Sequence, residues 1–292
     1  MDSNKKIPLI KEYRVDKLKN CLKYIDTYSF NRDKQKEFIL SLYPDKKDKD
    51  PEHKEKSVFR GMVIPSLRHL GLIVGYGDLL RTSANGKLII ESELTSKNLH
   101  QRVLRAVIYE IDQNIFQFID VLRENDSINI RNFLQLMNIN APSEKQKKER
   151  ISHWFSILKE VELINYNAKN IILNEHKYNQ ILSDVDVDNK SMEDFKKYLF
   201  KAYFELSKKT AGIIDIADLR ENVALKLLRE NKIILTENQF DEMLRKIPFA
   251  TDDYIISFGR PMGAEEKLFE RNGNYFRTLS IKFFRREVQN ES

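Results

Sequence analysis

The chain has 292 residues, which exceeds one typical domain and predicts two or three compact units. Hydrophobic residues make up 41% and charged residues 32%, which excludes wholesale disorder, and no stretch of about 20 uncharged apolar residues is present to cross a bilayer. The net charge of +6, with 7 Lys and Arg against 3 Asp and Glu in residues 254–286, favours a polyanionic partner.

The number of cysteines and the composition of the N-terminal residues predict the cellular location of the protein. The single Cys21 excludes an intrachain disulfide and a thiolate metal cage. Residues 1–9 are polar and lack the apolar core of a signal peptide. We therefore expect a soluble protein of the reducing cytoplasm without membrane contact.

Three helices are predicted in the first part of the chain. Apolar residues in 15–28 recur at helical spacing, and Asn31 is suited to cap a second helix that ends near residue 43. The charged segment 44–56 predicts a loop. A third helix is expected from about Ser57, and Pro65 can restart it because proline suits a first helical turn.

An internal repeat follows these helices. Residues 66–73 resemble residues 157–164, and both patterns predict a helix that ends on an apolar position before a strand. The predicted strand pairs are 72–76 with 79–82, and a strand around Ile164 with 171–173. A supersecondary unit of about 90 residues is therefore expected at least twice.

The middle of the chain is predicted to be helical. Residues 99–123 carry one apolar stripe and should form a long linking helix. Ser127 is expected to open a helix through Met137. Ser143 with Gln146 forms a capping-box pair before a basic helix that runs to about residue 161. The alternating segment 183–189 predicts a domain boundary.

The last part combines three more helices with strands. The predicted helices are 191–209, capped by Ser191 with Asp194, 215–231, and 237–247, capped by Thr236 with Gln239. Strands are expected at 254–258 and 275–284. Asn272-Gly273-Asn274 is a hairpin signal, which predicts that 267–271 faces the second strand in one large basic hairpin.

Three helices followed by a two-stranded hairpin resemble the winged-helix variant of the helix-turn-helix. The junction at Leu70-Gly71-Leu72-Ile73 and the segment 80–89, similar to a second wing strand with its turn, carry this resemblance. It covers 57–90 and 127–174, and 191–286 more loosely. The layout is similar to the recognition domains of type IIS restriction endonucleases. The resemblance implies a mainly α fold with small β-hairpins (α+β), arranged as tandem winged-helix units at 1–98, 99–182 and 191–288.

In the helix-turn-helix family the second helix of the motif enters the major groove, and flanking elements hold phosphates. The resemblance implies DNA contacts from cations on the third helices and on the wings. In the first unit the candidates are Lys56, Arg60 and Arg68 on the third helix and Arg81 and Lys87 on the wing. In the second unit they are Lys145, Lys147, Lys148 and Arg150 at the start of the third helix. On the last hairpin they are Arg260, Lys267, Arg271, Arg277 and Lys282. A solvated charged face explains lysines 145–148 equally well. Trp154 is expected in the core, and His69 and His153 as surface or packing residues.

No catalytic pattern is present in the sequence. The five histidines show no zinc-ligand spacing, so no metal or cofactor is expected. Gly77 to Lys87 does not match a phosphate-binding loop. A nuclease needs converging carboxylates, and the spacing of Asp78, Glu91, Glu93 and Lys97 fits no such element. We expect no enzyme.

The expected function is therefore recognition of duplex DNA. One setting is the recognition subunit of a restriction or phage-defence system, with a nuclease or ATPase on another polypeptide, and another is transcription regulation. The alternative is a scaffold subunit of a chromosome-organising or transcription complex, in which the third helices and wings bind protein.

Overall fold

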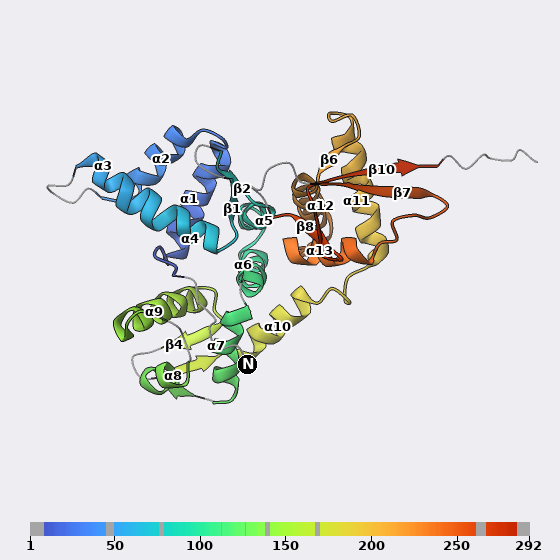
Figure 1. Cartoon of the computed structure of the whole chain (residues 1–292). Helices are drawn as coiled ribbons and strands as arrows, with labels where there is room; N and C mark the ends of the chain where they lie inside the picture. The colour runs from blue at the N-terminus through green and yellow to red at the C-terminus, as the bar shows by residue number, and fades with distance from the viewer. Residues whose placement is uncertain are drawn as a thin grey trace, which may run out of the picture. The chain divides into compact units, whose positions relative to one another are not determined.

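The computed structural model describes residues 9–44, 50–75, 79–111, 113–125, 127–137, 141–166, 170–260 and 267–284. The described chain is mostly helical with small antiparallel sheets, as the α+β class predicts (Figure 1). It divides into two compact units, residues 1–185 and 186–292. A further division of the first unit near residue 98 stays a prediction. Within these ranges, no helix has the length and apolar character needed to span a bilayer.

The first unit begins with three helical segments around an apolar core. Its elements are α1 (Val15–Thr27), α2 (Arg32–Ser41), α3 (Pro51–Lys54), the π-helical η1 (Glu55–Val63), α4 (Ile64–His69), β1 (Ile73–Val74), β2 (Arg81–Thr82) and α5 (Ala84–Glu93). Asn31 caps α2 by accepting a hydrogen bond from the Lys34 N–H at 3.2 Å, as predicted. Leu18, Leu22 and Ile25 of α1 are buried.

The third helical segment starts earlier than the sequence indicated. It begins at Pro51 rather than near Ser57, because the Asp50 side chain accepts from the Glu52 N–H and Pro51 suits the first turn. The end of the predicted loop 44–56 is therefore helical, and residues 45–49 lie outside the described residues. Pro65 does occupy the first turn of a restarted helix, α4, which follows the π-helical stretch.

The predicted wing segment 80–89 is wrong beyond Thr82. The Ser83 hydroxyl accepts from the Gly86 N–H at 3.1 Å and caps α5, so the chain turns into a helix where a strand end and turn were expected. Gly86 is needed there because a Cβ would overlap the Leu72 carbonyl oxygen. Residues 76–78, the expected turn, lie outside the described residues.

The rest of the first unit contains a second strand pair and an additional strand. Its elements are α6 (Lys97–Ile111), α7 (Gln113–Arg123), β3 (Ile128–Asn129), α8 (Ile130–Leu136), α9 (Glu144–Glu160), β4 (Ile164–Tyr166), β5 (Asn170–Leu173) and α10 (Glu175–Val185). The sheet has the order β3-β5-β4, with β5 antiparallel to both neighbours. The predicted helix 99–123 is described as α6 and α7, on either side of residue 112.

Two helix boundaries in this part differ from the prediction. Ser127 does not open a helix, because a short strand comes first and Asn129 caps α8 by accepting from the Asn132 N–H at 2.9 Å. The segment 183–189 is not wholly irregular, since α10 extends to Val185. Ser143 caps α9 as predicted.

The two segments that are similar at an offset of 91 residues make the same backbone hydrogen bonds. Gly71 and Glu162, with φ of 62° and 60°, end their helices in the left-handed region. The next N–H bonds the carbonyl five residues back, from Leu72 to Leu67 and from Leu163 to Leu158, each at 2.9 Å. The correspondence continues to the helix caps, where Ser83 accepts from the Gly86 N–H and Asn174 from the Lys177 N–H.

Helix α6 is shared by both halves of this repeat, because α5 and α10 each pack against it. Arg102 forms an ion pair with Asp184 of α10 at 2.5 Å. Arg105, only 1% exposed, donates to the Val161 carbonyl at 3.1 Å and to the Gln180 side chain at 2.9 Å. The end of α9 and helix α10 are thus tied to α6.

The second unit contains three helices and two small sheets. Its elements are α11 (Met192–Ser207), β6 (Ile214–Asp215), α12 (Ile216–Asn231), α13 (Glu237–Lys246), β7 (Tyr254–Gly259), β8 (Phe269–Arg271), β9 (Asn274–Phe276) and β10 (Thr278–Phe283). The predicted helices and the caps at Ser191 and Thr236 are confirmed. One sheet has the order β6-β10-β7 and the other pairs β8 with β9.

The hairpin predicted at 260–286 is confirmed around Asn272-Gly273, where β8 pairs with β9, but it does not continue to residue 284 as one large hairpin. The expected strand 275–284 is interrupted at Arg277, whose N–H donates to the Gly259 carbonyl and whose carbonyl accepts from the Ile216 N–H. β9 pairs with β8, whereas β10 pairs with β6 and β7. The cause is packing. Leu279 and Ile281 of β10 are buried in the core, where β10 pairs with β6 and β7, so β10 does not continue the hairpin with β8.

Candidate nucleic-acid interface

Helix α9 presents one polar stripe to solvent. Lys145, Lys148, Ser152 and Lys159 are exposed, and their spacing of three, four and seven residues places them on one side of the helix, where the exposed Glu149 and Glu160 also lie. The opposite side packs into the core through Ile151, Trp154, Phe155, Ile157 and Leu158. Trp154 is fully buried, as predicted. The amphipathic pattern of α9 therefore fixes which side the lysines occupy.

The four cations predicted at the start of α9 do not lie together. Lys145 and Lys148 belong to the exposed stripe, whereas Lys147 and Arg150 are half-buried. Two residues of α-helix correspond to a rotation of about 200°, so each half-buried cation points away from its exposed neighbour. The sequence reasoning missed Ser152 and Lys159, which the helical spacing from Lys145 and Lys148 could have found.

The candidate cations on the third helix of the first unit have partners nearby. Lys56 lies 2.7 Å from Glu52, and Arg60 donates to the Glu55 carboxylate at 2.7 and 2.9 Å. Arg68 donates to the Gly75 carbonyl at 2.5 Å. These cations lie on η1 and α4, as the prediction places them, but they are part of local ion pairs and hydrogen bonds.

The two candidates assigned to the first wing lie on different elements. Arg81 is a half-buried residue of β2. Lys87 is not on the wing, because Ser83 starts α5 before it. Its ammonium forms an ion pair with Asp26 of α1 at 2.5 Å. Lys87 thus links two helices of the first unit.

Helix α13, the third helix of the second unit, buries the acidic side chains of Glu237 and Asp241, whereas Glu242 and Lys246 are exposed. Arg220 of α12 donates to both oxygens of Asp241 at 2.7 and 3.0 Å, and the two side chains are 2% and 3% exposed. Arg220 also donates to the Lys267 carbonyl at 2.6 Å. Gln239 and Glu237 of α13 are buried as well. This helix is largely part of the core.

The cations of the last predicted hairpin are distributed over several elements. Lys267 contacts the Asn238 side chain and lies 3.7 Å from Asp241. Arg271 stacks its guanidinium 3.3 Å from the centre of the Phe249 ring, and burial lowers its pKa. Arg277 donates to the Asp215 carboxylate at 3.1 Å. Arg260 and Lys282 are exposed.

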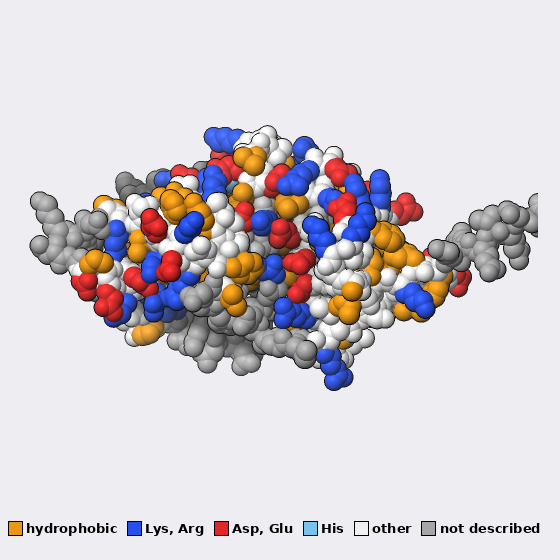
Figure 2. Space-filling view, turned by 90° about the horizontal axis from the view of Figure 1, so that it is seen from above, with side chains coloured by type: hydrophobic (Ala, Val, Ile, Leu, Met, Phe, Trp, Pro, Cys, Tyr) orange, Lys and Arg blue, Asp and Glu red, His pale blue; other side chains and the backbone are white. Residues whose placement is uncertain are grey.

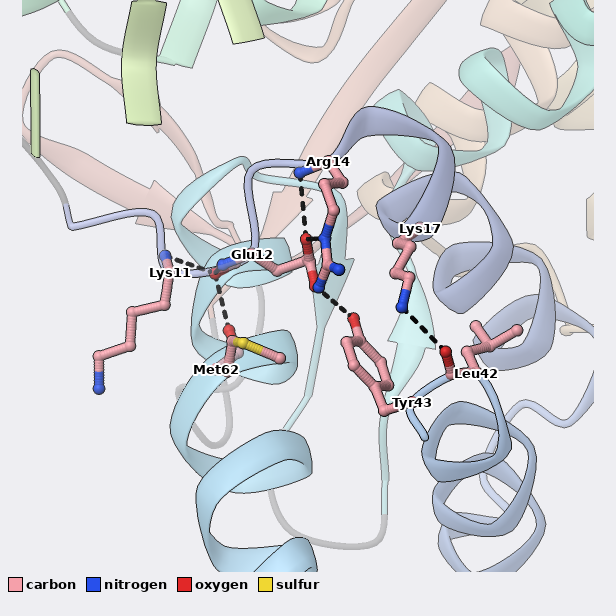
Figure 3. Close-up of polar contacts among 8 residues, drawn as sticks. Lys11, Glu12, Arg14, Lys17, Leu42, Tyr43 and Met62 are labelled. Carbon is pink, nitrogen blue, oxygen red and sulfur yellow. Dashed lines mark hydrogen bonds and ion pairs between the residues drawn. The ribbon is translucent and has the colours of Figure 1, made fainter. Parts of the chain in front are cut away.

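A buried carboxylate lies where the N-terminal segment meets α2 (Figure 3). Glu12 is fully buried and accepts from the Arg14 guanidinium at 2.7 and 2.5 Å and from the Tyr43 hydroxyl at 2.6 Å. Burial alone would raise the pKa of Glu12, but these hydrogen bonds outweigh it and lower that pKa. Burial raises the pKa of the neighbouring Cys21 thiol to about 12, so Cys21 stays protonated at neutral pH.

The same N-terminal segment contacts α9. His153 donates from Nδ1 to the Ile10 carbonyl at 2.6 Å, and its ring stacks on Tyr13 with centroids 4.4 Å apart. The N–H groups of Lys11 and Glu12 donate to the Ser66 hydroxyl. His153 is therefore a packing residue, as predicted, and the segment connects α9 to α4.

The acidic residues between 78 and 93, whose spacing fits no nuclease element, are described only in part. Asp78 lies outside the described residues, and Glu93 forms an ion pair with Lys23 at 2.9 Å. Among the residues that the structure describes, no group of three or more His, Cys, Asp or Glu side chains could hold a metal ion.

Charge is mixed on one face of the molecule. In the face shown in Figure 2, basic and acidic side chains of the described residues are interspersed with hydrophobic ones. The α9 stripe is thus the best-defined group of the predicted cations. Comparisons with family models, with curated proteins and with solved structures found no match to this chain.

Proposed function

We propose that this protein binds duplex DNA, with the exposed stripe of α9 as the principal contact. The observation that carries the proposal is the position of that stripe. α9 is the last helix of the series α7, β3, α8, α9, β4, β5, whose sheet order is β3-β5-β4. We infer from this series a winged helix, a motif in which the third helix enters the major groove. Lys145, Lys148 and Lys159 would then face phosphates, and Ser152 a base edge.

The second unit supports a tandem arrangement. Its series α11, β6, α12, α13, β7, β10 has the sheet order β6-β10-β7 and so repeats the same topology. Its third helix is mostly buried, so its contribution to DNA binding would come from the exposed cations Arg260 and Lys282. A chain with this design suits the recognition subunit of a restriction or defence system, with catalysis on a partner chain.

The test is binding of a labelled random-sequence duplex at about 50 and 200 mM salt. We compare the wild type with a variant that carries Lys145→Gln, Lys148→Gln and Lys159→Gln. Each lysine that contacts a phosphate should contribute about 1 to the slope of log K against log salt concentration, so the variant should lose affinity and about 3 units of slope. Its urea midpoint should stay close to the wild-type value, since the three side chains are exposed.

The matched control removes three exposed lysines from the second unit, Lys197, Lys208 and Lys209, by substitution with Gln. Its net charge equals that of the α9 variant, so a general charge effect would weaken both equally. Equal loss in both variants, or no binding by the wild type at 50 mM salt, contradicts the proposal.

A second candidate is protein binding by the second unit, in line with a scaffold function. Phe204 and Phe284 are 50% and 39% exposed, and Phe204 stacks on Phe283 with centroids 4.7 Å apart. Exposed aromatic residues are enriched at protein interfaces. A Phe204→Ser variant that loses a captured partner while retaining DNA affinity would separate this function from the first.

A further inference from the structure

A polar cavity lies in the first unit, and its lining includes no residue of α9 and none of the Glu12 cluster, that is, Glu12, Arg14 and Tyr43. Its volume is about 440 Å³, and it is lined by residues of η1, of the first turns of α2 and of the segment before α2. Pockets for small ligands usually have volumes of about 300–1,000 Å³. The volume is therefore sufficient for a ligand of the size of a nucleotide.

Cations converge in this cavity on one carboxylate. The Glu55 side chain lies 2.7 Å from Arg60, 3.4 Å from Lys36 and 3.8 Å from Arg32. Lys36 also lies 3.3 Å from Asp33. Three positive charges thus face two negative ones. Hydrogen bonds from Arg60 lower the pKa of Glu55, which remains an internal counter-ion at neutral pH.

Phe30, at the edge of the cavity, has an unusual conformation. Its φ is 64°, a left-handed value that is uncommon for a bulky residue, and its N–H donates to the Leu80 carbonyl at 3.1 Å. The side chain is 57% exposed although it lines the cavity. A strained backbone that exposes an aromatic ring does not serve the core, and such strain is often found at binding sites.

We propose that this cavity binds a nucleoside phosphate, with the phosphate beside Arg32, Lys36 and Arg60 and the base stacked on Phe30. Guanidinium and ammonium groups bind phosphate oxygens, and aromatic rings stack on bases of any sequence. The start of α2 is not counted in this attraction, because the Asn31 side chain already accepts from the Lys34 N–H. The site is independent of the proposed DNA contact at α9.

The test is calorimetric titration of the full chain with AMP, inorganic phosphate and adenosine. AMP should bind at least about tenfold more tightly than either fragment, because both halves of the site are then used. Arg60→Gln should weaken AMP binding about ten- to a hundredfold, the range of a hydrogen bond to a charged group. Glu55→Gln should tighten it, because the competing carboxylate is removed.

The Phe30→Gly variant distinguishes the contribution of the Phe30 ring to AMP binding from its contribution to folding stability. Glycine tolerates a positive φ, so the thermal midpoint should not fall, whereas AMP affinity should decrease and phosphate affinity should not change. Lys56→Gln is the matched control, since Lys56 is also on η1 but pairs with Glu52 rather than lining the cavity. It should leave AMP binding unchanged.

Three outcomes would overturn the proposal. One is the absence of AMP binding at millimolar concentration, and another is equal affinity for AMP and phosphate. The third is that the wild type does not bind AMP while the Arg60→Gln variant binds duplex DNA more weakly than the wild type. This result would assign the cavity to a DNA backbone phosphate. The α9 variant should keep AMP binding, so failure of the DNA proposal and failure of this one are distinguishable.

Discussion

Helices α9 and α13 follow the same order of elements, but they differ in how far their charged side chains are buried. On α9, Lys145, Lys148 and Lys159 are exposed along one stripe. On α13, Asp241 is 3% exposed and paired with Arg220. The difference shows that helices at the same place in the order of elements can differ in the burial of their charges, so the partners of those charges must be identified before a role is assigned.

The β8–β9 hairpin accounts for the difference. It is inserted between β7 and β10, and its Phe269 is fully buried and stacks on Phe258 with centroids 5.3 Å apart. Arg245 of α13 donates to the Glu270 carbonyl of β8 at 2.8 Å. In the first unit, by contrast, β4 and β5 are separated by only three residues, 167–169.

The largest effect is expected from Arg220→Met, which tests whether α13 is structural. The substitution removes the buried Arg220 pair of Asp241 and leaves only Lys267, at 3.7 Å, as a counter-ion; breaking a buried pair destabilises proteins by about 3–5 kcal/mol. The free energy of unfolding in urea is the measurement. Arg220→Met with Asp241→Leu should recover most of the loss, because neither charge then remains. A loss below 1 kcal/mol in the single variant would place this pair in contact with water.

A smaller effect is expected from Glu12→Gln, which loosens the segment that contacts α9. Removing the carboxylate at neutral pH should cost about 2–3 kcal/mol, as expected for hydrogen bonds to a charged group. Because the folded-state pKa of Glu12 is lowered, its stabilisation is present above the ordinary value near 4.5 and is lost as pH falls through the folded pKa. Urea unfolding of both proteins from pH 7 to pH 3 should show the difference shrinking. A constant difference would refute the assignment to the carboxylate.

The smallest difference concerns the two helix caps. Thr236 of α13 is fully buried and forms a reciprocal capping box with Gln239, whereas Ser143 of α9 is exposed. We expect Thr236→Ala to cost about 2 kcal/mol and Ser143→Ala about 0.5–1 kcal/mol, the upper and lower parts of the usual range. Equal losses by thermal unfolding would show that burial does not strengthen this cap.

Local patterns predicted much of the fold. The caps at Ser143, Ser191 and Thr236 follow from interactions within four residues, and the sequence contains both partners. The end of the first wing was missed because Ser83 can cap a helix as well as end a strand. The break at Arg277 depends on pairing with strands that are distant in the sequence.

The candidate sites were predictable to different degrees. The α9 stripe could have been found from the spacing of Lys145 and Lys148, extended to Lys159, outside the buried positions. The Glu12 cluster could not, because Tyr43 and Ser66 are 31 and 54 residues away. The cations around Glu55 also come from separate helices, so only the tertiary structure brings them together.

The position of α6 between α5 and α10 has a consequence for synthesis on the ribosome. α5 precedes α6 in the chain, but α10 is the last helix of the unit, and Arg102 and Arg105 find Asp184 and Gln180 only when it has emerged. Until then one side of α6 lacks its neighbour, and Arg105 lacks its Gln180 acceptor. The nascent first half should therefore wait in a partly folded form, open to chaperones, until residue 185 has left the exit tunnel.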